Sequence, residues 1–199
     1  TGESTDPAAM EAEALELAAS SDVVVMALGE HMLQSGEGGA RTDITIPAPQ
    51  KRLLKRVRAL GKPVVLVLFN GRPLALTDVI DDCDAIVEAW FPGTAGGRSV
   101  ADVLFGTVNP SGRLTVSFPH NVGQEPLYYA QLSTGRPAKT STHSGRFVSR
   151  YMDCPNDAMF PFGYGLSYHT ARYDNLRLSA DELTADGVIE VSIDVTNEG

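Results

Sequence analysis

The sequence predicts an α/β domain with a three-layer, doubly wound and mostly parallel sheet, followed by the start of a second, all-β domain. Three apolar runs, at 23–28, 64–69 and 85–91, the last with Glu88 inside it, are typical of parallel strands covered on both faces. Helical segments alternate with these strands, which is the pattern of a doubly wound fold. Apolar and polar residues then alternate at 189–195, as in an antiparallel strand with one solvated face.

Three helices are expected around the sheet. The first begins at Asp6-Pro7, an N-cap followed by a proline, and extends to about Ala19. The second covers 49–60, where leucine and valine recur on one face and a glycine follows the last turn. The third covers 94–105 and also ends at a glycine.

Charge argues against two classes of partner. The exposed face of the 49–60 helix has five cations, Lys51, Arg52, Lys55, Arg56 and Arg58. Because the whole chain has a net charge of −9, we interpret this face as solvated and expect no nucleic acid as a partner. No apolar run approaches the roughly 20 residues that cross a bilayer, so no membrane partner is expected either.

The character of the sequence changes after about residue 107. Residues 114–118 alternate like a strand, and 119–168 are rich in loop-forming residues. Two further strands, at 173–178 and 189–195, fit an antiparallel sandwich, but two strands cannot bury a sandwich core. We therefore divide the chain into 1–170 and 171–199, and we expect it to be a fragment of a longer protein.

The candidate functional segment is Ser35-Gly36-Glu37-Gly38, which follows the first apolar strand. Glycines on both sides of Glu37 let the backbone turn and approach a ligand. Ligands of parallel sheets bind beyond the carboxyl ends of the strands, and the Glu37 loop, 70–73 and 92–94 all leave from that edge. From the pattern alone, a catalytic carboxylate and a flexible surface loop both remain open.

Other motifs favour structural roles. The glycine-rich segment 93–97 lacks the lysine of a phosphate-binding loop and the spacing of a dinucleotide fold, so close packing is favoured. The sequence has no GxSxG elbow, so a Ser-His-Asp hydrolase is not expected. Its four histidines lack ligand spacing, so no metal site is expected. Cys83 and Cys154 are interpreted as unpaired structural cysteines. Glu88, inside an apolar strand, is interpreted as an ion-paired or hydrogen-bonded structural group.

A series of motifs between about residues 20 and 170 resembles, in order, the second domain of glycoside hydrolase family 3. The motifs are GE at 29–30, SGEG at 35–38, RTDITIP at 41–47 with Gln50, NGRP at 70–73, AWFPGTAGG at 89–97, NPSGRL at 109–114 and FPFGYGLSY at 160–168. Within the family, they are most similar to those of bacterial periplasmic β-glucosidases. Residues 171–199 are similar to the opening of the fibronectin type III-like domain that ends many such enzymes.

The resemblance implies a flavodoxin-like sandwich in a retaining β-glucosidase that removes terminal non-reducing β-D-glucosyl residues. Its acid/base would be Glu37, while the nucleophile, an aspartate, would lie on an N-terminal barrel domain of the same protein. Ser35, Gly36, Gly38 and Arg41 would form the substrate-side loop, with Arg41 and Asp43 anchoring its far end. The implied substrate is a β-glucoside or oligosaccharide, without a cofactor, and the implied location is periplasmic or secreted.

One departure and two alternatives follow. Many relatives have Asp-Arg where this chain has Ala40-Arg41, so any role of that aspartate is unfilled. Another branch of the family uses a histidine–aspartate pair on the barrel, and the SGEG motif argues against that branch. Without the barrel, we expect the chain alone to be inactive. The alternatives are a non-catalytic carbohydrate-binding or structural α/β domain, and a nucleotide-binding domain, for which a phosphate site is missing.

Overall fold

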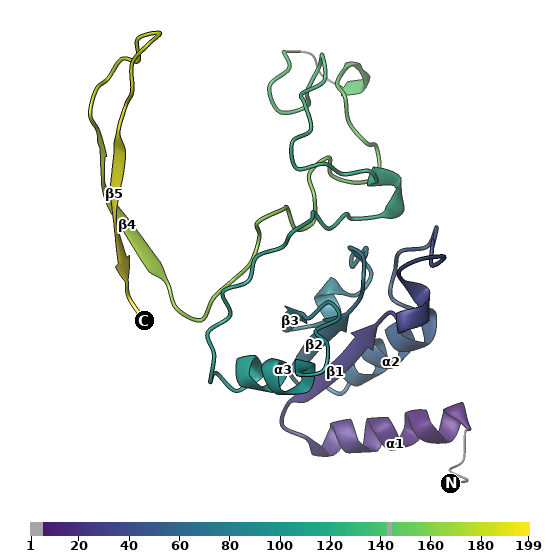
Figure 1. The fold of residues 1–199 in the computed structure, drawn as a ribbon. Helices are drawn as coiled ribbons and strands as arrows, with labels where there is room; N and C mark the ends of the chain where they lie inside the picture. The colour runs from purple at the N-terminus through teal and green to yellow at the C-terminus, as the bar shows by residue number, and fades with distance from the viewer. Residues whose placement is uncertain (1–5, 143–144) are drawn as a thin grey trace. The chain divides into compact units, whose positions relative to one another are not determined.

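The computed structural model describes residues 6–142 and 145–199, which belong to two compact units (Figure 1). The first unit comprises Thr1–Val100 and Leu114–Tyr164, and the second comprises Ala101–Arg113 and Gly165–Gly199. The boundary at 170 that the sequence suggests stays a prediction.

The first unit contains a parallel three-stranded sheet in the order β1-β2-β3. Its strands are β1 (Val24–Gly29), β2 (Val64–Phe69) and β3 (Ala85–Glu88). Val24 pairs with Val64, and Val65 pairs with Ala85, so the three strands run side by side with their carboxyl ends at one edge. This arrangement confirms the predicted α/β class with a parallel sheet.

The helices begin and end close to the predicted residues. They are α1 (Pro7–Ser20), α2 (Ala48–Arg58) and α3 (Gly96–Leu104). Asp6 caps α1 by accepting a hydrogen bond from the amide of Ala8 at 3.0 Å. α2 buries Leu54 and Val57, and it contacts both α1 and β1. Short 3₁₀ segments lie at η1 (Met32–Gln34), η2 (Ile80–Asp82), η3 (Val122–Gln124) and η4 (Gly145–Phe147).

The core is centred on β2. Val64, Leu66 and Leu68 are fully buried, and Val67 is 2% exposed. Around this strand lie apolar residues from β1, from the helices and from the connecting segments, namely Ala18, Met26, Ile46, Leu54, Val57, Leu74, Leu76, Val79 and Phe118. The edge of the Trp90 ring meets Phe118, with 5.7 Å between the centroids. The continuous apolar run of β2 is thus explained by burial on both faces.

The prediction of two covered faces is wrong for β1 within the described residues. Val23 and Val25 are each 52% exposed, whereas Met26 packs in the core with Ala18 and Leu54. Successive side chains of a strand point to opposite faces, so one face of β1 meets the helices and the other is open.

The predicted strand at 114–118 is also wrong. Its backbone meets 160–164 only intermittently: the amide of Leu114 donates to Tyr164, and Phe118 forms an isolated antiparallel bridge with Phe160. Pro161 lies in the partner segment and has no amide hydrogen to donate, so a continuous ladder cannot form there.

The cationic face of α2 is an ion-paired helix surface. Lys51 pairs with Asp78 at 2.6 Å, Arg56 with Glu11 at 2.6 Å and Arg58 with Asp84 at 2.7 Å. These contacts support the interpretation of a solvated helix face. Among the described residues, no helix combines the length and apolar character needed to cross a membrane.

The second unit contains an antiparallel pair, β4 (Ala171–Leu178) and β5 (Val191–Asn197). Hydrogen bonds from Asn175 and Arg177 to Asp194 tie the two strands together and lower the pKa of that aspartate. Tyr173, Ile193 and Val195 remain 45–65% exposed. As expected from the sequence, two strands alone do not bury the apolar face of the pair.

Candidate active-site loop and the ion-pair network beneath it

The loop that contains Glu37 follows β1 and η1. Gly36 and Gly38 adopt φ values of +98° and +73°, and the amide of Gly39 donates to the carbonyl of Gly36 at 3.0 Å. The turn therefore uses backbone conformations that side-chain-bearing residues rarely adopt. Glu37 lies at the tip with its side chain exposed, and it has no hydrogen-bond or ion-pair partner among the described residues.

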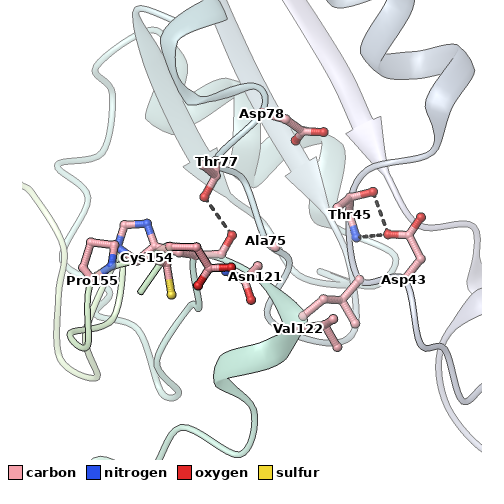
Figure 2. A pocket seen from close by; sticks show the side chains of 12 residues that line it. Asp43, Thr45, Ala75, Thr77, Asp78, Asn121, Val122, Cys154 and Pro155 are labelled. Atoms are coloured by element: carbon pink, nitrogen blue, oxygen red, sulfur yellow. Dashed lines mark hydrogen bonds between the residues drawn. The ribbon is translucent and has the colours of Figure 1, made fainter. Parts of the chain in front are cut away.

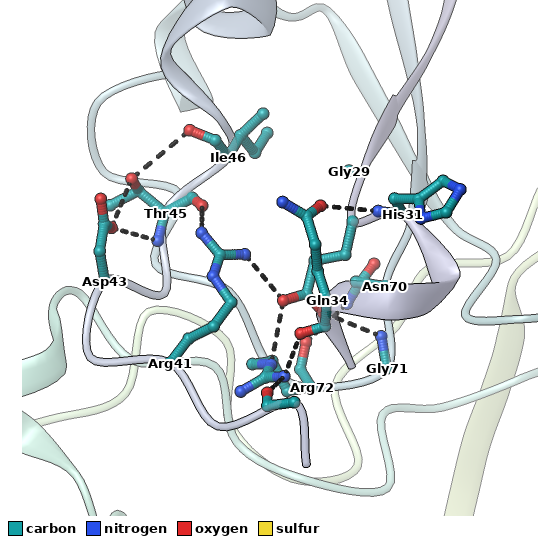
Figure 3. A network of polar contacts seen from close by, with 12 residues as sticks. Gly29, His31, Gln34, Arg41, Asp43, Thr45, Ile46, Asn70, Gly71 and Arg72 are labelled. Atoms are coloured by element: carbon teal, nitrogen blue, oxygen red, sulfur yellow. Dashed lines mark hydrogen bonds and ion pairs between the residues drawn. The ribbon is translucent and has the colours of Figure 1, made fainter. Parts of the chain in front are cut away.

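Glu30, directly after β1, is buried and contacts Arg41, Gly71 and Arg72, which are labelled in the polar network of Figure 3. Its side chain is 0% exposed and lies 2.8 Å from Arg41 Nη1 and 3.0 Å from Arg72 Nε. The amide of Gly71 also donates to Glu30 Oε2, at 3.3 Å. A carboxylate can stay buried and ionised when cations and donors surround it in this way.

Arg72 connects this buried carboxylate to both ends of the Glu37 turn. Its Nη2 donates to the carbonyl oxygen of Gln34 at 2.6 Å and to that of Gly39. Gln34 precedes Ser35-Gly36-Glu37-Gly38, and Gly39 follows it. The guanidinium of Arg72 therefore links the residues on the two sides of the turn, Gln34 and Gly39.

Arg41 and Asp43 organise the segment that leads from the loop to α2. Arg41 Nη2 donates to the carbonyl of Thr45 at 3.3 Å. Asp43 accepts hydrogen bonds from the amide and the hydroxyl of Thr45, at 2.9 and 2.7 Å, and these bonds lower its pKa. Lys51 from α2 donates to the same hydroxyl at 3.1 Å. Ala40 is exposed beside them.

The three segments that leave the carboxyl edge of the sheet meet at Gly71. A β-carbon placed there would lie 2.1 Å from Ser35 Oγ and 2.8 Å from the Phe91 ring. Only a residue without a side chain allows this approach. The parallel order of the strands agrees with the prediction that the Glu37 loop, 70–73 and 92–94 leave the same edge of the sheet. The side chain of Gln50 holds the end of β1 through two hydrogen bonds. Its Oε1 accepts from the Gly29 amide at 2.7 Å, and its Nε2 donates to the Gly29 carbonyl at 3.0 Å.

Glu88, at the end of β3, is a half-buried carboxyl that forms no ion pair with any described residue. Its Oε1 accepts a hydrogen bond from the amide of Trp90 at 2.9 Å, in agreement with the predicted hydrogen-bonded role. Within the described residues, Glu88 Oε2 and Asn70 Oδ1 lack hydrogen-bond partners. Burial raises the pKa of Glu88 to about 7, and the hydrogen bond from the Trp90 amide opposes this rise.

A separate pocket of about 360 Å³ is lined in part by the Asp43–Thr45 segment (Figure 2). Its lining comes from Asp43, Ile44, Thr45, Ala75, Thr77, Asp78, His120, Asn121, Val122, Asp153, Cys154 and Pro155. Thr77 closes one side by donating to the carbonyl of His120 at 2.7 Å. None of Ser35, Gly36, Glu37, Gly38 and Arg41 lines it, so this pocket is distinct from the Glu37 loop.

The cysteines and histidines show no sign of redox or metal chemistry in the described part of the chain. Cys83 and Cys154 are free and half-buried, as predicted, and burial raises the pKa of Cys83 to about 11. No group of three or more histidine, cysteine, aspartate or glutamate side chains there is placed to hold a metal ion. His143, one of the four histidines, lies outside the described residues.

Sequence reasoning singled out Glu37, Ser35 and Arg41, and it missed the roles of Glu30 and Arg72. The structure brings Ser35 against Gly71 and Arg41 against Glu30, while Glu37 is exposed and pairs with none of the described residues. A usable signal existed: Glu30 and Arg72 each follow the end of an apolar strand closely. Since neighbouring parallel strands end at the same edge, opposite charges in these positions predict an ion pair.

Comparison with known proteins identifies the family. The family model described as "Glycosyl hydrolase family 3 C-terminal domain" matches residues 4–168. The chain is 49% identical over 193 residues to the periplasmic beta-glucosidase of Salmonella typhimurium, covering 97% of this chain and 25% of that protein. It is 41% identical over 187 residues to a beta-xylosidase of Formosa agariphila, covering 94% of this chain and 25% of that protein.

Solved structures agree. A β-glucosidase from Erythrobacter marinus matches with a TM-score of 0.81 and 37% identity, covering 98% of this chain and 26% of that one. The Listeria innocua β-glucosidase in complex with gluconolactone matches with a TM-score of 0.77 and 36% identity, covering 99% of this chain and 32% of that one. The chain belongs to glycosyl hydrolase family 3 and contains its C-terminal domain. It spans about a quarter of the length of the curated relatives that it matches.

Proposed function

We propose that this chain is the acid/base-bearing part of a retaining β-glucosidase, with Glu37 as the general acid and base. The nucleophile, an aspartate, belongs to a barrel domain elsewhere in the same protein. The observation that supports this role best is the exposed, partner-free carboxyl of Glu37 at the tip of a turn whose two ends are held by Arg72. Such a group is accessible to a substrate bound by a neighbouring domain.

The reaction needs two carboxyl groups, one ionised as the nucleophile and one protonated as the acid. In the first step, the nucleophile attacks the anomeric carbon while Glu37 donates its proton to the departing glycosidic oxygen. In the second step, the Glu37 carboxylate takes a proton from a water molecule, whose oxygen replaces the aspartate on the sugar. Retaining enzymes place the two carboxyl groups about 5–5.5 Å apart, so Glu37 must reach the neighbouring domain's pocket.

The proposed substrate class is a terminal non-reducing β-D-glucosyl residue of a glucoside or oligosaccharide. The 49% identity to a protein named a periplasmic beta-glucosidase supports this choice and a periplasmic or secreted location. Residues 171–199, with their antiparallel pair β4 and β5, are proposed to open a fibronectin type III-like domain.

The test is Glu37→Gln in the full-length protein. We expect kcat/KM for cellobiose to fall about 10²- to 10⁴-fold, because its sugar leaving group needs protonation. For 2,4-dinitrophenyl β-glucoside, whose leaving group departs without a proton, kcat/KM is expected to fall less than about tenfold. Glu13→Gln, an exposed carboxylate on α1, is the matched control and should leave both values unchanged.

Azide provides an independent readout of the same variant. A small anion attacks the glycosyl–enzyme intermediate without losing a proton, so it needs no general base. Azide should therefore raise kcat of the Glu37→Gln protein on the dinitrophenyl substrate and yield β-glucosyl azide. Equal losses on both substrates, without an azide effect, would favour a non-catalytic role for this domain.

A further inference from the structure

We propose that Arg72, held by the buried Glu30, is a positioning residue that sets where the Glu37 carboxyl lies during proton transfer. This inference rests on the proposed acid/base role of Glu37. It assigns a function to two residues that touch neither the substrate nor the glutamate itself.

Glu37 has no contact of its own to fix it. Its side chain is exposed and unpaired among the described residues, and the flanking Gly36 and Gly38 permit many backbone conformations. Proton transfer, in contrast, requires the donor within hydrogen-bond reach of the leaving oxygen. The placement of Glu37 must therefore come from the ends of its turn.

Arg72 is the side chain that controls both ends. Its Nη2 donates to the carbonyls of Gln34 and Gly39, which lie on either side of the turn. The same guanidinium presents Nε to Glu30 Oε1 at 3.0 Å. Nη2 therefore makes two hydrogen bonds, while Nε faces Glu30 in an ion pair without a directed hydrogen bond. A lysine ammonium on a flexible stem cannot reproduce this planar arrangement.

Glu30 fixes Arg72 in turn. It is fully buried at the end of β1, receives Arg41 at 2.8 Å and the Gly71 amide at 3.3 Å, and so has little freedom to move. The chain of contacts runs from the parallel sheet through Glu30 and Arg72 to the backbone on both sides of Glu37. The sheet thereby determines the position of the turn that contains Glu37.

The experiment is Arg72→Lys in the full-length protein, assayed with cellobiose and with 2,4-dinitrophenyl β-glucoside. We expect kcat/KM for cellobiose to fall about 10- to 100-fold, since displacing a catalytic group by about 1 Å has an effect of that size. The dinitrophenyl substrate needs no proton, so its kcat/KM should fall less than about threefold. A general folding defect would lower both values by the same factor.

A double variant makes the test stricter. If Arg72 acts through Glu37, then Arg72→Lys combined with Glu37→Gln should lose no more activity on cellobiose than Glu37→Gln alone. Multiplied losses in the double variant, or equal losses on both substrates in Arg72→Lys, would overturn the inference. Arg56→Lys, which alters an ion pair with Glu11 on the surface of the same unit, is the control and should change neither value.

Two further results separate this inference from the proposed function. A leaving-group effect in Glu37→Gln but not in Arg72→Lys defeats the positioning role alone, whereas its absence in Glu37→Gln defeats both. If Arg72→Lys does not fold, Arg41→Lys takes its place, because it can keep a charge near Glu30 while losing the contact to Thr45. The same selective loss on cellobiose is then expected, and equal losses overturn the role of the network.

Discussion

At the scale of single residues, the carboxyl groups of Glu30 and Glu88 are withdrawn from solvent in very different surroundings. Each lies at or just beyond the end of a parallel strand. Glu30 has two guanidiniums and a backbone amide around it. Glu88 has one backbone amide and no cation, and burial raises its pKa to about 7. Only the first is suited to hold other residues by charge.

Glu88 should make the stability of the protein depend on pH. Between its ordinary pKa of 4.5 and about 7, the folded protein retains a proton that the unfolded chain has released. The free energy of unfolding therefore decreases as pH rises through this window, by up to roughly 3 kcal/mol at about 1.4 kcal/mol per pH unit. Glu88→Gln removes this titration, so its free energy of unfolding should exceed that of the wild type at pH 8.

Urea unfolding of the wild type and Glu88→Gln at pH 4.5 and pH 8 measures the effect. The glutamine retains an oxygen that can accept from Trp90, so the two proteins should be similar at pH 4.5. A gap between them that does not widen toward pH 8 contradicts the assignment. Glu16→Gln, an exposed carboxylate on α1, should show no such pH-dependent difference.

At the scale of elements, the site is built where three connections leave the same edge of the sheet. The loop after β1 supplies Ser35, the segment after β2 supplies Gly71, and the segment after β3 supplies Phe91. These pieces meet because parallel strands place successive carboxyl ends side by side. Their close approach makes Gly71 the position that couples all three.

Gly71→Ala should therefore disturb the Glu37 loop through Ser35. The new β-carbon would lie 2.1 Å from Ser35 Oγ, so Ser35 must move, at a cost of about 1–3 kcal/mol in unfolding free energy. Movement of Ser35 shifts the start of the turn, so kcat/KM of the full-length protein on cellobiose should fall by about tenfold or more. Urea unfolding and kinetics on both glucosides measure the two effects.

Gly97→Ala is the matched control for this substitution. Gly97 lies in α3, and a β-carbon there would meet no atom within 4 Å. Alanine in a helix is favoured over glycine by about 0.5–1 kcal/mol, so stability should be unchanged or increased. If Gly71→Ala behaved like Gly97→Ala, the three segments would not be coupled at this point.

The elements were largely predictable because their signals are local. Apolar runs identified β1, β2 and β3, and an N-cap with proline identified α1. The two wrong predictions concern features that depend on residues far away in the sequence. Exposure of Val25 depends on what covers a sheet face, and the irregular pairing of 114–118 depends on Pro161 in a partner segment more than 40 residues away.

The candidate site divides in the same way. The turn around Glu37 follows from its glycines and from the family motif, both of which are written in adjacent residues. The contact of Arg72 with Glu30 joins positions on two different strands, so no local pattern specifies it. Only the parallel order of β1 and β2 makes it expected.

At the scale of the whole molecule, the proposal assigns one of the two carboxyl groups of a retaining mechanism to the described units. The family match covers residues 4–168, and the chain spans about a quarter of its curated relatives. The acid/base at an exposed loop tip fits a site completed by another domain. Division of this kind makes activity depend on how the domains are joined as well as on each domain's own stability.

The last prediction tests this division directly. A protein consisting of these 199 residues should not hydrolyse 2,4-dinitrophenyl β-glucoside above the buffer rate, although this substrate needs no acid. The reason is the missing nucleophile: without a carboxylate to attack the anomeric carbon, an exposed Glu37 has no intermediate to form or resolve. Circular dichroism and a cooperative urea transition must first show that the fragment is folded. The full-length protein assayed alongside is the positive control, and hydrolysis by the folded fragment that Glu37→Gln abolishes would show that the nucleophile lies within this chain.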